Sequence, residues 1–170
     1  MLLMGCSPDS TGPEEAVCEE QCLPADFSLQ NADGDALSLP ELTGEAEALI
    51  VYGTATWCFS CREEFAWLNE VQAASSGRVA AVAVVLESTE PGKAPTEEDI
   101  ALLEGAYEPT FPVLLDEDGF MNEYRTSNAI PVNLVTNAEQ RWTIALRREG
   151  LNAEALQEAI DSITSQGEEP

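Results

Sequence analysis

A pair of cysteines three residues apart, placed between an apolar run and an amphipathic stripe, constrains the fold of this chain most strongly. Residues 48–52 are apolar and are followed by Gly53, as expected of a buried strand. The stretch Trp57-Cys58-Phe59-Ser60-Cys61 comes next. From Cys61 onward, apolar side chains recur at intervals of four, three and three residues, which predicts a helix. This stripe consists of Cys61, Phe65, Leu68 and Val71.

The rest of the chain alternates strand and helix patterns before it ends in a hairpin and a helix. Asp33-Gly34 is typical of a hairpin turn, and Asn152 is a good N-cap for a last helix that buries Leu156, Ile160 and Ile163. The pattern predicts an α/β fold with a central mixed β-sheet flanked by helices and an N-terminal β-hairpin. The further predicted elements are a hairpin over 27–39, strands at 79–86, 111–115, 132–135 and 141–146, and a helix over 96–103.

Charge excludes several classes of partner. The 170 residues suit a single domain and carry 32 acidic residues against 7 basic ones, a net charge of −25. Such a surface repels phosphate backbones, so we expect no nucleic-acid partner. It also provides no basic patch for anionic lipids, and no apolar run is long enough to cross a bilayer.

The complete absence of histidine removes further classes of chemistry. It excludes Cys-His and Ser-His catalysis and every metal site that depends on an imidazole. Covalent haem attachment needs Cys-x-x-Cys-His, but Arg62 follows Cys61 here. The cysteine pair is left with disulfide exchange, a structural disulfide, or a thiolate metal site shared with Cys18 and Cys22.

The predicted position of the pair favours disulfide exchange. The N-terminus of a helix presents unpaired N–H groups and a positive partial charge, which favour a thiolate over a thiol. A thiolate is the nucleophile in disulfide exchange. We therefore expect Cys58 to attack and Cys61, one helical turn further in, to resolve the mixed disulfide.

Three more cysteines lie near the N-terminus. Leu3-Met4-Gly5-Cys6 resembles a bacterial lipobox, in which the cysteine becomes lipidated, and a free thiol at Cys6 is the alternative. Residues 7–24 are rich in Pro, Ser, Gly and Glu and are interpreted as a tether. For Cys18 and Cys22 we favour a local structural disulfide, with an auxiliary redox pair, a metal site or unpaired thiols as alternatives.

The motif resembles that of the thioredoxin fold. Its continuation, Cys61-Arg62-Glu63-Glu64-Phe65, is similar to the active-site helix of bacterial membrane-anchored thioredoxin-like proteins of the TlpA/ResA type. The stretch Phe111-Pro112-Val113-Leu114-Leu115-Asp116 and the later Tyr124 and Ile130-Pro131 follow the order of that family. The resemblance covers roughly residues 25–165.

This resemblance assigns roles to individual residues. It places the family's active-site glutamate at Glu64, for which a solvated helix residue is the alternative. It implies a cis Ile130-Pro131 bond in a loop that packs against the sulfurs and pairs with the substrate chain. Trp57 is expected either in the core or beside the disulfide.

The sequence departs from the family at three places. Ala66 replaces a common proline, and Tyr52 stands where thioredoxin has a buried aspartate. Val132-Asn133 replaces a Thr-rich stretch after the proline, which leaves the substrate contacts open.

We therefore expect a thiol-disulfide oxidoreductase that needs no cofactor and no metal. Residues 1–24 would be a lipoprotein-like N-terminus and tether, 25–165 the thioredoxin-like domain and 166–170 a tail. The protein would act outside the cytoplasm as a tethered monomer, with protein dithiols or disulfides and an upstream thiol donor as partners. The alternatives are a non-catalytic module that binds copper or zinc, and a thiol peroxidase.

Overall fold

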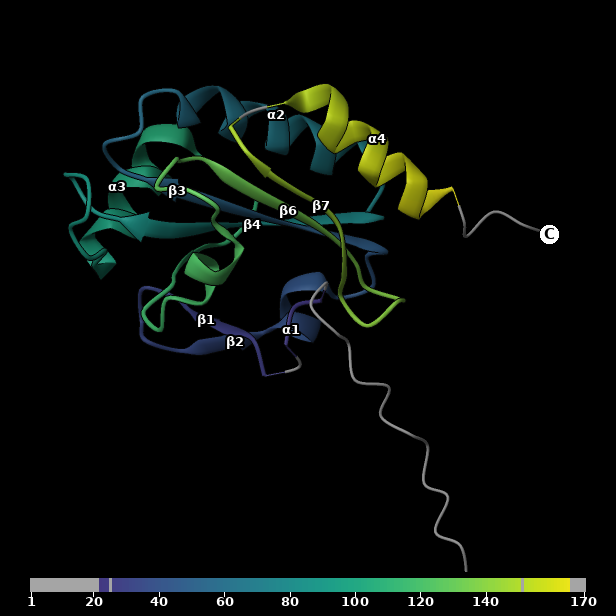
Figure 1. Ribbon diagram of the computed structural model, residues 1–170, viewed down its shortest axis with the longest axis horizontal. Coiled ribbons are helices and arrows are strands. Elements are labelled where there is room, and N and C mark those ends of the chain that lie inside the picture. The colour runs from purple at the N-terminus through teal and green to yellow at the C-terminus, as the bar shows by residue number, and fades with distance from the viewer. Residues whose placement is uncertain (1–21, 25, 151, 166–170) are drawn as a thin grey trace, which may run out of the picture.

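One mixed β-sheet organises the computed structural model, which describes residues 22–24, 26–150 and 152–165. The strands of this described part lie in the order β2-β1-β5-β4-β3-β6-β7 (Figure 1). They are β1 (Ser28–Gln30), β2 (Ala36–Ser38), β3 (Ala48–Ala55), β4 (Val79–Glu87), β5 (Val113–Leu115), β6 (Val132–Asn137) and β7 (Thr143–Glu149). The helices are α1 (Leu39–Thr43), α2 (Cys61–Ala74), α3 (Glu97–Tyr107), α4 (Ala153–Thr164) and the 3-10 helix η1 (Phe120–Tyr124).

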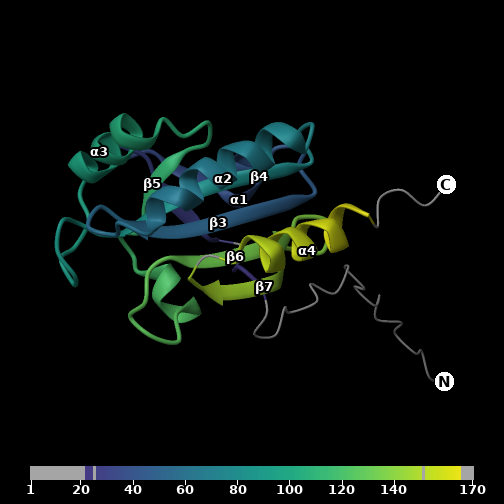
Figure 2. The same cartoon turned by 90° about the horizontal axis from the view of Figure 1, so that it is seen from above.

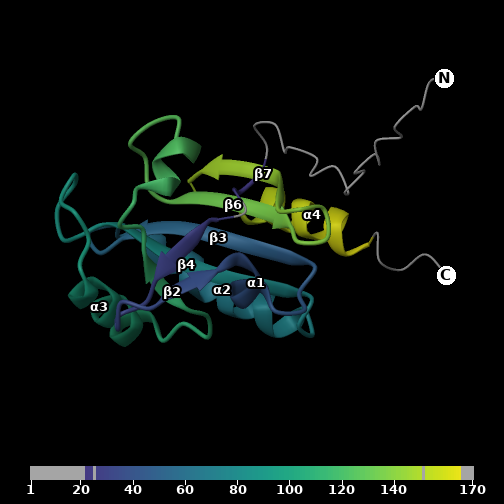
Figure 3. The same cartoon turned by 90° about the horizontal axis from the view of Figure 1, so that it is seen from below.

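The two faces of the sheet carry different layers. Side chains of α2, α3 and α4 pack into one core cluster, and Figure 2 shows α2 and α4 side by side over the sheet. On the opposite face, α1, η1 and the first hairpin pack into a second cluster, as Figure 3 shows for α1 and β2. The predicted α/β class, with helices on both faces and an N-terminal hairpin, is confirmed. None of the helices in the described ranges is long and apolar enough to cross a membrane.

The register between β3 and β6 brings two segments that are distant in the sequence to the same end of the sheet. β3 is buried along its whole length, parallel to β4 and antiparallel to β6. In this register Gly53 pairs with Val132. The turn that carries the cysteine motif and the loop that ends at Pro131 therefore meet at the same end of the sheet.

Gly53 lies inside β3 and does not end it, because the strand continues to Ala55, three residues beyond the end expected at Tyr52. A Cβ atom at Gly53 would stand 2.5 Å from Val132 Cγ1 and 2.7 Å from Leu86 Cδ1, closer than packed carbons approach. The absence of a Cβ atom at Gly53 therefore leaves room for the side chains of Val132 and Leu86 from the two neighbouring strands.

Side-chain caps mark the starts of α1, α3 and α4. Thr96 and Asp99 form the predicted capping box of α3, and Asn152 accepts a hydrogen bond from Ala155 N at the start of α4. Helix α1 was not predicted, although Ser38 and Glu41 form a capping box at its start. The 3-10 helix η1 was also missed. Asp116 accepts hydrogen bonds from the first two N–H groups of η1.

Two glycines test the close approach at β3. Gly53→Ala should lower the free energy of unfolding by about 1–3 kcal/mol, because the added methyl overpacks a buried contact. Gly105→Ala in α3, where nothing lies within 4 Å and φ is not positive, should raise it by about 0.5–1 kcal/mol. Urea unfolding measures both, and equal effects at the two positions would contradict the packing argument.

Candidate active site

The cysteine motif forms a disulfide between Cys58 and Cys61 at the junction of β3 and α2. Their Cα atoms are 5.4 Å apart, and Cys61 is the first residue of α2. Cys58 is 3% exposed and Cys61 1%, so exposure hardly distinguishes the two residues. Their surroundings differ more. The sulfur of Cys58 lies 3.5 Å from Ser60 Oγ and 3.9 Å from the carbonyl oxygen of Ile130.

The Ile130 loop is fixed beside the disulfide by side-chain and backbone hydrogen bonds. The peptide bond between Ile130 and Pro131 is cis, and Pro131 O accepts a hydrogen bond from Gly150 N. The Glu149 carboxylate accepts hydrogen bonds from the N–H groups of Thr126 and Ser127 and from the Ser127 hydroxyl. The hydrogen bonds from Ser127 are the main reason that the pKa of Glu149 falls to about 2. The segment that leads to Ile130 is thus held on the end of β7.

Glu64 is completely buried in the first turns of α2, so the solvated alternative is wrong. Its Oε1 atom accepts a 2.5 Å hydrogen bond from Asn133 Nδ2, and its Oε2 atom has no partner among the described residues. Burial raises the pKa of this carboxyl from 4.5 to about 7, and the hydrogen bond from Asn133 acts in the opposite direction. A carboxyl with this pKa can exchange a proton near neutral pH.

Tyr52, at the position of thioredoxin's buried aspartate, lies next to this carboxyl. Its hydroxyl donates a 2.9 Å hydrogen bond to the carbonyl oxygen of Cys61. Burial, and then the negative charge of Glu64, raise the pKa of Tyr52 well above its usual value, so it stays a neutral donor. Its ring meets that of Phe65 edge to face at 5.3 Å between centroids. Tyr52 therefore anchors the start of α2 through the Cys61 carbonyl. The buried carboxyl group of this site is supplied by Glu64 of α2 and not by the residue at the aspartate position on β3.

Trp57 is held by a charged pair that sequence reasoning missed. Its indole N–H donates a 3.0 Å hydrogen bond to Glu87 at the end of β4. Glu87 also forms an ion pair with Arg125, at 3.5 Å between Nη2 and Oε1, and the two side chains are only 13% and 8% exposed. Trp57 therefore packs against the core cluster and is tied to the end of β4 and to the loop after η1. No local sequence signal links these three residues.

Cys22 lies at the end of the sheet opposite to the disulfide. It forms a bridge with Thr143, which pairs with Asn137, which in turn pairs with Ala48 at the start of β3. The disulfide follows the other end of that strand, roughly 23 Å further along at about 3.3 Å per residue. Cys22 therefore cannot share a metal ion with the disulfide cysteines.

The remaining expectations for the N-terminal cysteines are not decided. Cys6 and Cys18 lie outside the described residues, so lipidation of Cys6 and a Cys18–Cys22 disulfide stay predictions. Leu23 is buried and donates its N–H to Trp142 O, so the packed part of the chain starts before the expected boundary at residue 25. Within the described ranges, no group of three or more Cys, Asp or Glu side chains is arranged to hold a metal ion.

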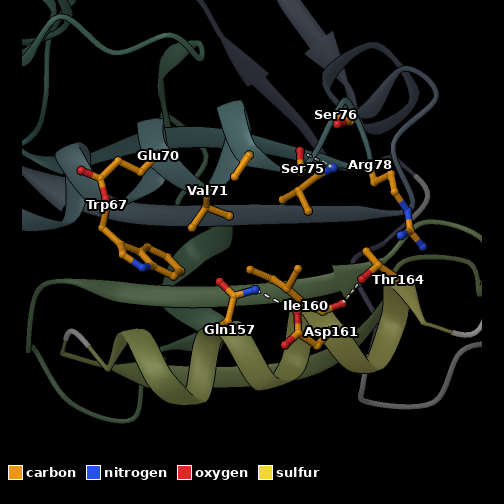
Figure 4. Close-up of a pocket in the computed structure, with 12 residues that line it drawn as sticks. Trp67, Glu70, Val71, Ser75, Ser76, Arg78, Gln157, Ile160, Asp161 and Thr164 are labelled. Carbon is orange, nitrogen blue, oxygen red and sulfur yellow. Dashed lines mark hydrogen bonds between the residues drawn. The ribbon is translucent and has the colours of Figure 1, made fainter.

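A cavity of about 550 Å³ between α2 and α4 lies apart from this chemistry (Figure 4). Trp67 stands near one end of the cavity and Arg78 near the other, with Gln157 and Asp161 along the α4 side. None of the residues predicted for the site lines it. The candidate site is therefore the disulfide and its surroundings at the carboxyl end of β3.

The raised pKa of Glu64 predicts a pH-dependent stability. Between pH 4.5 and about 7 the unfolded chain loses this proton while the folded protein keeps it, so folding becomes less favourable as pH rises. Glu64→Gln removes this loss. The difference in the free energy of unfolding between Glu64→Gln and wild type should therefore be more favourable to the variant at pH 8 than at pH 4, by up to about 3 kcal/mol. Urea unfolding of the oxidised proteins at the two pH values measures this, with Glu63→Gln, exposed in the same turn, as the control. A gain independent of pH would contradict the assignment.

Comparison with known proteins identifies a family model and relatives that this chain matches. The model of the AhpC/TSA family matches residues 20–147. Thioredoxin-like protein YneN of Bacillus subtilis (strain 168) is 32% identical over 111 residues, which are 65% of this chain and 61% of that protein. Sporulation thiol-disulfide oxidoreductase A of the same organism is 27% identical over 139 residues, which are 81% of this chain and 79% of that protein.

Solved structures agree on the fold. A thioredoxin-like protein from Aeropyrum pernix superposes with a TM-score of 0.68 at 18% identity, covering 82% of this chain and 90% of its own. The thioredoxin-like fold expected from the motif is thereby confirmed. The matched part spans less than two thirds of YneN. Since the family model covers most of the sequence, the chain belongs to the AhpC/TSA family.

Proposed function

We propose that this protein is a thiol-disulfide oxidoreductase that exchanges disulfides with partner proteins through Cys58 and Cys61. The observation that carries the proposal is the disulfide at the start of α2, with the Ile130 carbonyl beside the Cys58 sulfur. One relative, sporulation thiol-disulfide oxidoreductase A, has a name that states this activity. No observation favours the peroxidase or the metal-binding alternative.

The exchange proceeds in two balanced steps. In the reduced protein, the Cys58 thiolate attacks one sulfur of a partner disulfide, and the second partner sulfur leaves as a thiolate. The Cys61 thiolate then attacks the Cys58 sulfur, and the first partner sulfur leaves. The partner gains two electrons and the Cys58–Cys61 disulfide forms. The same steps in reverse oxidise a partner dithiol, so the cysteines carry the chemistry in either direction.

Glu64 takes the proton from Cys61 in this proposal. A buried thiol has a raised pKa, so Cys61 needs a base before it can attack. The chain contains no histidine, and Glu64 lies three residues further on in α2, with a pKa of about 7. Residues at this spacing share one face of a helix. The buried carboxyl is therefore suited to act as the general base for resolution.

Trp57, Ile130 and Pro131 form the proposed contact with the partner chain. Ile130 and Trp57 both pack partly buried against the cluster that contains the disulfide. The backbone of the Ile130 loop would pair with the partner segment while Cys58 is joined to it. Phe59, which follows Cys58 directly in the sequence and is 82% exposed, would add apolar area to this contact.

We further propose that the protein acts outside the cytoplasm as a monomer. Lipid attachment at Cys6 would tether it to the membrane, and residues 7–24 would give it reach. A Cys18–Cys22 disulfide would persist in such an oxidising compartment. An upstream thiol donor would then return the Cys58–Cys61 pair to its reduced state.

Trapping experiments test the roles of the two sulfurs. Cys61→Ser should accumulate a mixed disulfide with insulin or with a disulfide peptide, because the attack can occur but the resolution cannot. Cys58→Ser should accumulate little, since the proposed nucleophile is missing. Non-reducing electrophoresis with mass spectrometry reads both variants, and reduction of insulin by the wild-type protein confirms the activity. Trapping by Cys58→Ser alone would reverse the assignment.

A further inference from the structure

We propose that Asn133 is a positioning residue for Glu64, whose side-chain amide holds the carboxyl in both its ionised and its protonated state. The inference rests on the proposed role of Glu64 as the base for resolution. Neither the motif nor the family resemblance pointed to Asn133, which stands where a Thr-rich stretch is usual.

The register of the sheet places Asn133 under the first turns of α2. Asn133 pairs with Tyr52 across β3 and β6, and both side chains reach residues of α2. Asn133 and Glu64 are both 0% exposed and are joined by the 2.5 Å hydrogen bond. The bond connects residues 69 positions apart. The amide is thus fixed by the sheet, and it approaches the carboxyl from the side opposite to the helix.

An amide suits a partner that gains and loses a proton. Its nitrogen can donate to an ionised carboxylate, the arrangement in which Nδ2 faces Oε1 here, and its oxygen can accept from a protonated carboxyl. Both Asn133 Oδ1 and Glu64 Oε2 are buried without a hydrogen-bond partner in the described chain. A half-turn of the amide therefore gives protonated Glu64 an acceptor and leaves the carboxyl in place. Leucine offers neither group, and ionised aspartate offers only acceptors.

Among the described residues, Asn133 is the one polar contact of Glu64 that favours ionisation. The titratable group on a neighbouring element that interacts with the carboxyl is Tyr52 on β3, and Tyr107 on α3 interacts in turn with Tyr52. The cysteines of the motif precede Glu64 in the sequence by three and six residues. Side chains of β4 and α4 in the same cluster are apolar. Burial, the larger effect, raises the pKa of Glu64, and the hydrogen bond from Asn133 offsets part of this rise, so this amide makes the carboxyl release its proton more readily.

The test is a direct titration of the Glu64 carboxyl by ¹³C NMR in the oxidised protein. Asn133→Leu should move its midpoint upward by about one pH unit, because leucine removes the hydrogen bonds to both forms and the bond to the charged form is the stronger one. Asn133→Asp should also raise it, because two carboxylates in contact do not both ionise readily. Thr136→Val is the control, since Thr136 is buried on the same strand but bonds to Leu49 O.

The pH profile of resolution supplies a second reading. In Asn133→Leu the apparent pKa of the resolution rate should rise together with the titration midpoint of Glu64, and the rate should approach that of wild type at high pH. A purely structural defect would lower the rate at every pH without changing this apparent pKa. An unchanged Glu64 midpoint in Asn133→Leu would overturn the proposal, and Asn133→Asp carries the same test if Asn133→Leu does not fold. A shifted midpoint with an unshifted rate profile would support the role of Asn133 and refute that of Glu64.

Discussion

Pairing of β3 with β6 is the constraint on which the site depends. This pairing joins two segments about 80 positions apart in the chain and sets Gly53 opposite Val132. The turn after β3 and the loop before β6 therefore meet at the same end of the sheet. The same register sets Tyr52 against Asn133 beneath α2. Within the described residues, the side-chain hydrogen bonds to the Glu64 carboxyl and to the Cys61 carbonyl oxygen come from these two strands.

Burial of Glu64 is the energetic cost of this arrangement and the source of its chemistry. A carboxyl removed from water favours its neutral form, so the folded protein loses stability when the group ionises. One hydrogen bond offsets part of this cost without adding a charge. In the proposed mechanism, for a chain with a net charge of −25 and no histidine, a carboxyl with a raised pKa would supply the base near neutral pH that an imidazole otherwise provides.

Local sequence patterns predicted the parts of the fold that depend on local rules. The apolar runs of β3 and β4, the stripe of α2 and the cap of α4 at Asn152 were all predicted because period and capping are encoded within a few residues. The end of β3 was placed too early, since the reason for Gly53 is a contact with Leu86 and Val132 from other strands. Short elements such as α1, with five residues, have too little periodicity to be recognised.

The residues of the candidate site also fall into those that the sequence indicates and those that only the folded structure shows. The cysteines were evident from their spacing, and the family resemblance pointed to Glu64 and to the loop at Pro131. Three further residues were not predicted, because each contacts a residue 30 to 69 positions away in the chain. Asn133 bonds to Glu64 and Glu87 bonds to Trp57, whereas Arg125 contributes only through its ion pair with Glu87. Only the assembled sheet shows that an amide and not a threonine hydroxyl faces the buried carboxyl.

The central claim, that Glu64 takes the proton of Cys61 during resolution, is tested most directly by single-turnover kinetics. A mixed disulfide between Cys58 and a small aromatic thiol would be prepared at low pH and then followed as it resolves between pH 5 and 9. The account predicts that the wild-type rate rises with an apparent pKa near 7 and that Glu64→Gln is slower by about tenfold or more at neutral pH. Identical rates and identical pH dependence in the two proteins would contradict it.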